Sequence, residues 1–266
     1  MNKLYRPFQP TITDAGLQRF GLSLQQLPAG HLLRNVVHSY LQVSAARPTP
    51  YPSIPDGTQA IFISPHGSRV GGALTRPCDI PVLEPGDYFG IRFYPGALRL
   101  FFNLDLSDIT DQLVDHKYLP CRSFGELHDR IYELQGFDER AQLCERWLLR
   151  HYEPRVATPF EQALSLIYQA FGNIKVSQLA AMVGWSSRHL NRMFQLHTGL
   201  NTKTFAQTIR VQHACRDLFT APADSLAAAT RLGYFDQAHL LNDFKKRFLS
   251  SPGVFFARFR SDFSNS

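Results

Sequence analysis

Long apolar segments are missing from this sequence. A helix that crosses a bilayer needs about 20 consecutive apolar residues, and no run in the 266 residues approaches that length. The first residues, MNKLYRPFQPTITDAG, also lack the apolar stretch of a secretion signal. These absences predict a cytoplasmic protein without a membrane partner.

Cysteines are few, and the signatures of catalysis are absent. There is no CxxC pair, metal-ligand spacing, HExxH motif, Ser-His-Asp pattern or phosphate-binding loop. The sequence therefore predicts no catalytic residue, no metal and no cofactor, and we do not expect an enzyme. We expect the cysteines to be small buried hydrophobic side chains. They are Cys78, Cys121, Cys144 and Cys215.

Acidic residues are scarce in the second half of the chain. Residues 158–266 contain 12 Lys and Arg against 6 Asp and Glu, a net charge of +6, whereas residues 1–157 contain 16 of each. The entire positive excess therefore lies in one segment, which points to a polyanion as its partner. A hydrophobic content of 44% is sufficient for a folded core and argues against global disorder.

The first half is rich in proline, glycine and short β-type runs. Turn chemistry separates these runs, which favours an antiparallel sheet, either cupin-like or a small barrel. Strands are predicted over residues 35–43, 59–64, 69–74 and 86–96. Two helices are expected to follow, over residues 123–134 and 137–152. Their apolar stripe either forms a dimer face or covers the sheet.

The second half is predicted to be all helical. The overall class is therefore α+β: a β-rich domain with a helical extension at residues 1–152, a linker at 153–159 and an all-α domain at 160–262. Proline opens the first helix and glycine closes it. Helices are expected over residues 159–172, 175–184, 201–219, 224–233, 235–248 and 251–260, and a further helix is expected after the turn at Gly184, ending at Gly199.

An internal repeat lies in this helical half. LAAMVGWSSRHLNRMF and AAATRLGYFDQAHLLNDF share a helix of small residues, a glycine followed by an aromatic residue, and a second helix that ends in phenylalanine. The turn of the second copy is one residue longer. This pattern predicts two helix-turn-helix units joined by a long helix. The matching positions are Gly184 with Gly233, Leu190 with Leu240, and Phe194 with Phe244.

The second helix of the first unit has a polar face without acid or lysine. At helical spacing, Leu190 and Phe194 share one face, while the other carries only arginine, asparagine and glutamine side chains. Such a face is either simply solvated or suited to base edges, because arginine pairs with guanine and asparagine or glutamine with adenine. The residues on it are Arg188, Asn191, Arg192 and Gln195.

Residues 160–262 resemble the AraC/XylS family of transcription regulators. The resemblance is carried by LAAMVGWSSRHLNRMFQLHTG, IRVQHACRDL and RLGYFDQAHLLNDFKKRFLSSPGVFFAR. It implies that each unit places a recognition helix in successive major-groove segments of double-stranded promoter DNA. The resemblance also suggests RNA polymerase as a partner and a homodimer as the assembly.

The resemblance assigns DNA-facing positions residue by residue. In the first unit they are Ser187, Arg188, His189, Asn191 and Arg192, with Gln195 one turn further. In the second unit they are Asp236, Gln237, His239, Asn242, Lys245 and Lys246. For the histidines and lysines, contact with solvent or phosphate is the alternative to base reading.

This chain also departs from the family pattern. Asn242 stands where many relatives carry arginine, with Asp243 beside it, and Leu249 replaces a glycine. Thr202 replaces a proline, and Ala228 replaces a large aliphatic residue. We therefore expect the second unit to read bases less well than the first.

The first half resembles the β-rich sensor domains that precede this DNA-binding module. Arg92 is either a buried ion-paired residue or an effector anchor, and His66 either lines a pocket or lies on a loop. The Asp56–Gly57 pair predicts a turn. The partner of this domain is expected to be a small-molecule effector, with a protein partner as the alternative. A fused enzyme would need a reactive, metal-held cysteine near the N-terminus, and none is present.

Overall fold

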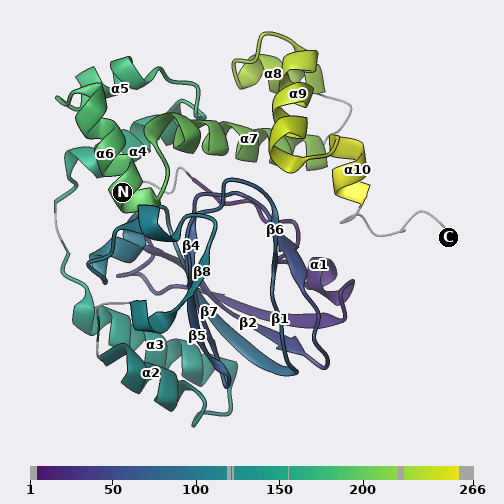
Figure 1. Cartoon of the computed structure of the whole chain (residues 1–266), viewed down its shortest axis with the longest axis vertical. Coiled ribbons are helices and arrows are strands. Elements are labelled where there is room, and N and C mark those ends of the chain that lie inside the picture. The colour runs from purple at the N-terminus through teal and green to yellow at the C-terminus, as the bar shows by residue number, and fades with distance from the viewer. Residues whose placement is uncertain (1–4, 119–120, 122, 155, 221–224, 258–266) are drawn as a thin grey trace.

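A β-rich part and a helical part lie one above the other in the computed structural model (Figure 1). It describes residues 5–118, 121, 123–154, 156–220 and 225–257. Residues 1–4, 119–120, 122, 221–224 and 258–262 of the predicted domains, and Arg155 of the predicted linker, lie outside the described residues. The predicted α+β class, with a β-rich part followed by a helical part, is confirmed. The predicted domain boundaries stay predictions.

One six-stranded antiparallel sheet forms the β-rich part and faces a small two-stranded sheet. The four predicted strands are present with shifts of a few residues at their ends, whereas the edge strands and both strands of the small sheet had no clear signal in the sequence. The order across the large sheet is β1 (Leu22–Pro28), β2 (Val37–Ala45), β7 (Gly86–Phe93), β4 (Gln59–Ser64), β5 (Gly67–Gly71) and β8 (Leu113–Asp115). The small sheet pairs β3 (Tyr51–Ser53) with β6 (Cys78–Ile80).

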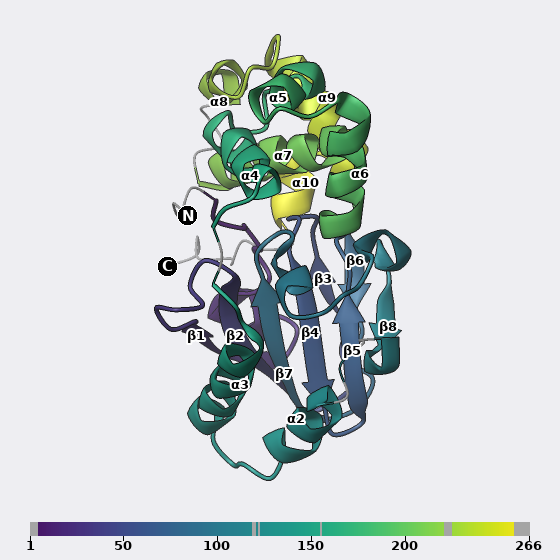
Figure 2. The same ribbon diagram turned by 90° about the vertical axis from the view of Figure 1, so that its left-hand side faces the viewer.

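Side chains alternate between the two faces of the large sheet, as the period of a strand requires. On β7, Phe89, Ile91 and Phe93 are fully buried in the core beneath α2 (Ser123–Ile131) and α3 (Phe137–His151). Arg92 lies on the opposite face, toward the small sheet. Figure 2 shows the two helices in front of the sheet.

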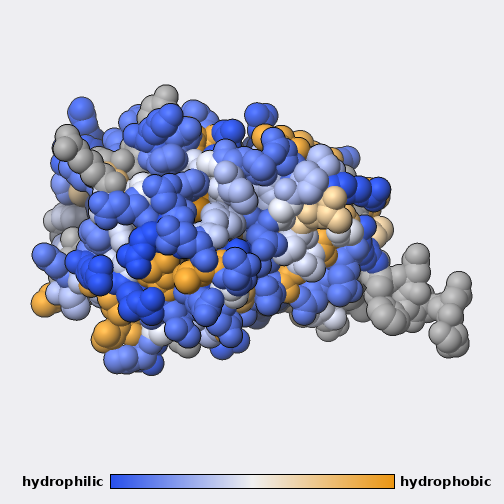
Figure 3. All heavy atoms as spheres, turned by 90° about the horizontal axis from the view of Figure 1, so that it is seen from below, coloured by the Kyte–Doolittle hydropathy of each residue, from blue (hydrophilic) through white to orange (hydrophobic). Residues whose placement is uncertain are grey.

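The apolar stripe of α2 and α3 covers the sheet. Leu143, Trp147 and Leu148 are buried in the same core as the strands. This confirms the covering role and leaves the expected homodimer untested. Seen from below, the molecule is mostly hydrophilic, with several small hydrophobic patches (Figure 3).

Short elements connect these layers. The segment after β7 forms a single 3-10 turn, η1 (Ala97–Leu100). The other short elements are α1 (Asp14–Gln18), η2 (Leu106–Ile109) and η3 (His116–Tyr118). Among the described residues, no helix has the length and apolar character that a membrane crossing requires.

Seven helices follow in the described part of the chain, close to the predicted ranges. The longest, α7, connects two helix pairs that lie at its opposite ends (Figure 1). Each pair has its own hydrophobic core, centred on Leu190 and Phe194 in the first and on Leu240 and Phe244 in the second. The helices are α4 (Pro159–Gln169), α5 (Val176–Met182), α6 (Ser187–Thr198), α7 (Thr202–Thr220), α8 (Ser225–Arg231), α9 (Gln237–Phe248) and α10 (Pro252–Ala257).

Residues from the first half complete both helical cores. Tyr5 is buried in the first core and stacks on Tyr168 of α4, with 4.9 Å between ring centroids. Ile54 is buried in the second core. The β-rich and helical parts are therefore packed against each other.

The cysteines only partly match the expectation. Cys144 and Cys215 are buried, and burial raises the pKa of both thiols. Cys78 is exposed, so the expectation was wrong for it, because β6 is a short strand at the surface. Cys121 is intermediate.

Candidate nucleic-acid interface

Each helix-turn-helix turn is built by a glycine and a capping side chain. Gly184 and Gly233 have φ angles of 71° and 70°, a region that residues with a Cβ rarely adopt. The Ser186 hydroxyl accepts the His189 N–H at 3.2 Å, and the Asp236 carboxylate accepts the His239 N–H at 2.7 Å. Residues 183–186 separate the first helix pair and residues 232–236 the second, so the second turn is one residue longer, as predicted.

The polar face of α6 is open to solvent. Arg188, Arg192 and Gln195 are exposed, while Leu190 and Phe194 on the other face are fully buried. Arg192 Nη2 lies 3.1 Å from His189 Nδ1, which places the two side chains together on the surface. A shallow hollow lies along this face. It is lined by Ser186, Arg188, His189, Asn191, Arg192 and Gln195.

Asn191 differs from its neighbours on this face. It is half-buried, and its Oδ1 accepts the N–H of Thr202 at 3.1 Å, at the first residue of α7. A bidentate contact to adenine needs that same oxygen. Asn191 therefore has a structural role that the sequence pattern did not indicate, since it ties α6 to α7.

The corresponding residues of α9 form a second exposed face. Asp236, Gln237, His239, Asn242, Lys245 and Lys246 are all exposed. Gln237 Nε2 donates to Ser225 Oγ at 2.6 Å and links the starts of α8 and α9. Asp236 holds the first turn of α9 through its cap. The His239 Nδ1 accepts the Phe235 N–H at 3.4 Å, so three of these six side chains already have partners within the protein.

Asp243 belongs to a polar network rather than to the free surface. It accepts hydrogen bonds from the Tyr234 hydroxyl at 2.9 Å and from Arg247 Nε at 3.3 Å. Arg247 also donates to Gln207 of α7 at 2.7 Å, and the Arg210 guanidinium lies 4.5 Å from the centre of the Tyr234 ring. The negative charge beside Asn242 is thus compensated by Arg247, and the network joins α9 to α7.

The two recognition helices lie on a common side of the domain. Figure 2 shows α6 and α9 on one side of α7, with α4 and α8 on the other. α6 contains no acidic residue, and the one acid within α9 is the compensated Asp243. The surface formed by these two helices is therefore positively charged and rich in hydrogen-bond donors.

Both expected effector residues line cavities inside the β-rich part. Arg92 lines a cavity of about 230 Å³, and His66 lines an adjoining one of about 180 Å³. His66 lies in the β4–β5 turn as well as in the cavity wall, and its Nδ1 lies 2.9 Å from Glu84 Oε2. The two cavities share the lining residues Tyr51, Phe62, Ile80, Pro81 and Leu113.

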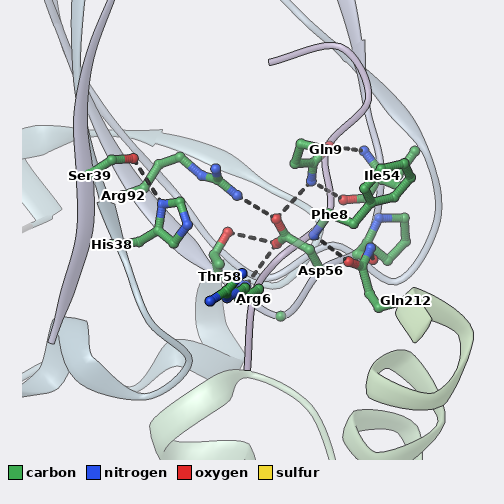
Figure 4. A network of polar contacts seen from close by, with 12 residues as sticks. Arg6, Phe8, Gln9, His38, Ser39, Ile54, Asp56, Thr58, Arg92 and Gln212 are labelled. Atoms are coloured by element: carbon green, nitrogen blue, oxygen red, sulfur yellow. Dashed lines mark hydrogen bonds and ion pairs between the residues drawn. The ribbon is translucent and has the colours of Figure 1, made fainter. Parts of the chain in front are cut away.

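Arg92 is a buried ion-paired residue that also lines the cavity, so its role as an effector anchor stays a prediction. Its Nη2 lies 2.7 Å from Asp56 Oδ2, and the two side chains are 6% and 5% exposed (Figure 4). The sequence predicted only a turn at Asp56. A buried arginine requires an anionic partner, but nothing in the sequence tells which acid supplies it.

The surroundings of this pair depress the pKa of a histidine. Burial, and then the positive charge of Arg92, lower the pKa of His38 to about 4. His38 lies beside Arg92 in Figure 4, and its Nδ1 is 2.9 Å from Ser39 Oγ. His38 is therefore neutral near pH 7.

A further cavity lies between the two parts of the molecule. It measures about 210 Å³ and is bounded by the end of β7, by Tyr152, Val156 and Ala157, and by α4. Aromatic rings dominate its wall, including Tyr94, Tyr152, Phe160 and Tyr168. Among the described residues, no group of three or more His, Cys, Asp or Glu side chains is arranged to hold a metal ion.

Two known families match separate segments of the chain. Residues 179–258 match the family described as "Helix-turn-helix domain". Residues 25–115 match "Domain of unknown function (DUF6597)". The first segment contains both recognition helices, and the second contains Asp56, His66 and Arg92.

Curated relatives resemble about half of the chain. The "HTH-type transcriptional regulator GlxA" of Rhizobium meliloti (strain 1021) is 30% identical over 127 residues, which cover 48% of this chain and 37% of the relative. The "Uncharacterized HTH-type transcriptional regulator YbfI" of Bacillus subtilis (strain 168) is 25% identical over 130 residues, 44% of this chain and 47% of the relative. The matches thus span less than half the length of these relatives.

Two solved structures show a weak likeness to this chain. ToxT from Vibrio cholerae gives a TM-score of 0.45 at 7% identity, over 90% of this chain and 98% of that chain. The C-terminal domain of AraT, a response regulator from Geobacillus stearothermophilus, gives 0.37 at 23% identity, over 42% of this chain and 95% of that one.

Proposed function

We propose that the chain is a sequence-specific double-stranded DNA-binding transcription regulator of the AraC/XylS type, a proposal supported by the match of residues 179–258 to a helix-turn-helix domain. The observation that carries the proposal is the free polar face of α6. Arg188, Arg192 and Gln195 are exposed there over a fully buried apolar face. In the proposed complex this face enters the major groove of promoter DNA.

The two units take different parts in recognition. Arg188 and Arg192 read base edges, because a guanidinium can donate two hydrogen bonds to guanine. Lys245 and Lys246 contact phosphates, since an ammonium at the end of α9 acts as a point charge. The amides at the start of each helix add phosphate contacts, helped by the helix dipole. Ser187, His189, His239 and Asn242 are proposed to complete the interface.

A small-molecule effector is proposed to bind in the cavity that Arg92 lines. The cavity is lined by residues of both sheets, and its wall is mostly apolar with a few polar side chains, which is the usual character of a small-molecule site. A protein partner on the surface of the same domain is the alternative. Contact with RNA polymerase and formation of a homodimer also belong to the proposal, and no surface of the chain is assigned to either.

Selection from a random DNA library followed by fluorescence anisotropy tests the regulator proposal. The selected duplex should bind the full chain at least a hundredfold more tightly than a scrambled duplex of equal length. Affinity should also fall steeply with salt, as about six phosphate contacts require. Equal affinity for both duplexes at every salt concentration would refute sequence-specific binding.

Thermal unfolding of the full chain against a metabolite panel tests the effector proposal. A compound that occupies the cavity should raise the midpoint in a concentration-dependent way. Arg92→Met should abolish that shift, whereas His31→Gln, a change at an exposed histidine, should preserve it. Stabilisation by a protein from the same cell, and by no small molecule, would favour the alternative.

A further inference from the structure

A short loop connects the cavity that Arg92 lines with α7, the helix that joins the two helix-turn-helix units. Residues 53–58, named the 53–58 loop, run from the end of β3 to β4. Ile54 is 1% exposed and packs in one cluster with Val211 and Ala214 of α7. The Pro55 carbonyl accepts a hydrogen bond from Gln212 Nε2 of α7 at 2.7 Å. The loop is thus attached to α7 by apolar packing and by a hydrogen bond.

The same loop is held at the cavity by a carboxylate. Asp56 Oδ2 accepts hydrogen bonds from Arg92 Nη2 at 2.7 Å and from Gln9 Nε2 at 2.8 Å, while Oδ1 accepts the Thr58 N–H at 2.9 Å (Figure 4). Asp56 and Arg92 both line the cavity. One buried side chain therefore fixes the conformation of the loop and faces the space where an effector would lie.

The N-terminal segment forms a second set of hydrogen bonds to the loop and to α7. The Phe8 N–H donates to Gln212 Oε1 at 2.7 Å, so both ends of the Gln212 amide are engaged. Gln9 accepts the Ile54 N–H at 3.1 Å and donates to the Ile54 carbonyl at 2.6 Å. A displacement of the loop must consequently either break the hydrogen bonds of Gln212 or move α7.

The chemistry of the ion pair decides which ligand displaces Asp56. Asp56 is the one acid that pairs with Arg92 among the described residues, and a buried charge without a partner is strongly unfavourable. Arg92 therefore releases Asp56 only to another anion. A carboxylate fits best, because it presents the same two oxygens to the planar guanidinium. A neutral ligand leaves the pair intact.

We propose that the Arg92–Asp56 pair is a releasable connection between the cavity and α7, and that a ligand carrying a carboxylate opens it by replacing Asp56 on Arg92. Opening frees the 53–58 loop and loosens its attachment to α7, which sets the relative position of the two helix-turn-helix units. The proposal rests on the proposed function only in taking this cavity as the effector site.

Hydrogen exchange of the full chain measures the connection directly. Asp56→Ala should accelerate amide exchange in residues 209–216 of α7 at least fivefold. Asp138→Ala removes an exposed carboxylate from the first turn of α3 and should leave that exchange unchanged. Equal exchange of α7 in the two variants would overturn the proposal.

Chemical rescue separates the charge of Asp56 from its covalent attachment to the loop. Acetate added to Asp56→Ala should raise its unfolding temperature by pairing with Arg92, and neutral acetamide should not. Exchange in α7 should stay fast, because acetate is not joined to the loop. Rescue by both compounds would overturn the role of the carboxylate. Recovery of α7 protection with acetate would overturn the role of the loop.

Gln212→Leu approaches the connection from α7 and keeps the proposal testable if Asp56→Ala does not fold. It should accelerate exchange in the 53–58 loop, and its effect on α7 should not add to that of Asp56→Ala. Unchanged loop exchange in Gln212→Leu, or full additivity, would contradict the connection. None of these measurements involves DNA, so a failure of the regulator proposal is recognised separately by the binding experiment above.

Discussion

The two helix-turn-helix units share one fold but present different surfaces. On α6 the exposed polar side chains include two arginines and have few partners within the protein. On α9 the start of the helix is engaged through Asp236 and Gln237, its middle through Asp243, and its free charges are the two lysines near the end. The first unit is therefore built to offer bidentate donors, and the second to offer point charges.

The C-terminal ends of α6 and α9 also differ between the two units. α6 ends at Gly199 with φ of 78°, and its carbonyl accepts a hydrogen bond from Thr110 of the β-rich part at 2.8 Å. α9 ends at Leu249, which adopts a left-handed φ of 57° although it has a Cβ, and 75% of it is exposed. The second unit thus carries backbone strain that the first avoids. A repeat can keep its fold while its caps and surfaces diverge.

Acidification should produce the largest effect, a loss of folding stability at α7, the helix that joins the two units. Burial, then the charges of Arg216 and Arg231, lower the pKa of His213 to about 4. Between the ordinary value of about 6.5 and that value, the unfolded chain binds a proton that the folded chain excludes, so stability falls as the pH falls. We expect this residue to contribute a loss of about 2 kcal/mol between pH 7 and pH 5.

Urea unfolding of His213→Leu at the two pH values checks this expectation. The variant should lose less stability on acidification than the wild type, by about 2 kcal/mol. The pKa of His38 in the β-rich part is also lowered to about 4, so His38→Gln should likewise lose less stability on acidification than the wild type. An identical pH dependence of stability in His213→Leu and wild type would show that folding does not lower the pKa of His213.

Replacement of the surface arginine tests the division of roles between the units. Arg192→Ala should weaken binding to the selected duplex by about 1–3 kcal/mol and relax the preference for one base pair. Asn242→Ala at the second unit should cost less and leave base preference unchanged. Anisotropy with duplexes substituted one base pair at a time measures both effects. Uniform weakening by Arg192→Ala across all duplexes would assign this side chain to phosphate.

Opposite substitutions at the two caps test the difference in strain. Leu249→Gly should stabilise the chain by about 0.5–1 kcal/mol, because glycine adopts the left-handed region freely. Gly199→Ala should destabilise it by at least about 1 kcal/mol, since a Cβ there would lie 2.8 Å from the Leu106 carbonyl oxygen. Thermal unfolding measures both. Changes of the same sign would contradict the comparison.

Salt dependence should reveal the smallest difference. Lys245→Gln combined with Lys246→Gln should reduce the slope of log affinity against log salt by about two, without altering base preference. Arg146→Gln, at an exposed position on α3, should leave the slope unchanged. Titrations at several salt concentrations measure it. An unchanged slope in the double variant would remove the second unit from the phosphate contacts.

Much of the helical half was predictable because its signals are local. The 3.6-residue period gave the buried faces of α6 and α9, the glycines gave the turns, and the repeat gave the extra residue of the second turn. The edge strands and the small sheet were missed because β1 mixes three leucines with three polar residues and a proline, and β3, β6 and β8 have only three residues each. The exposure of Cys78 was missed for the same reason, since its strand is too short to show a buried face.

The sequence by itself determined that two copied helical units carry an arginine-rich and a lysine-rich surface, because helical period, capping and charge are properties of neighbouring residues. Only the tertiary structure decided which of those side chains stay free: Asn191 caps α7, and Asp243 is neutralised by Arg247. It also paired Arg92 with Asp56, 36 residues earlier, and Gln212 with Pro55, 157 residues earlier. Such partners are selected by the need to satisfy buried polar groups wherever the chain brings them together, and no local pattern encodes that choice.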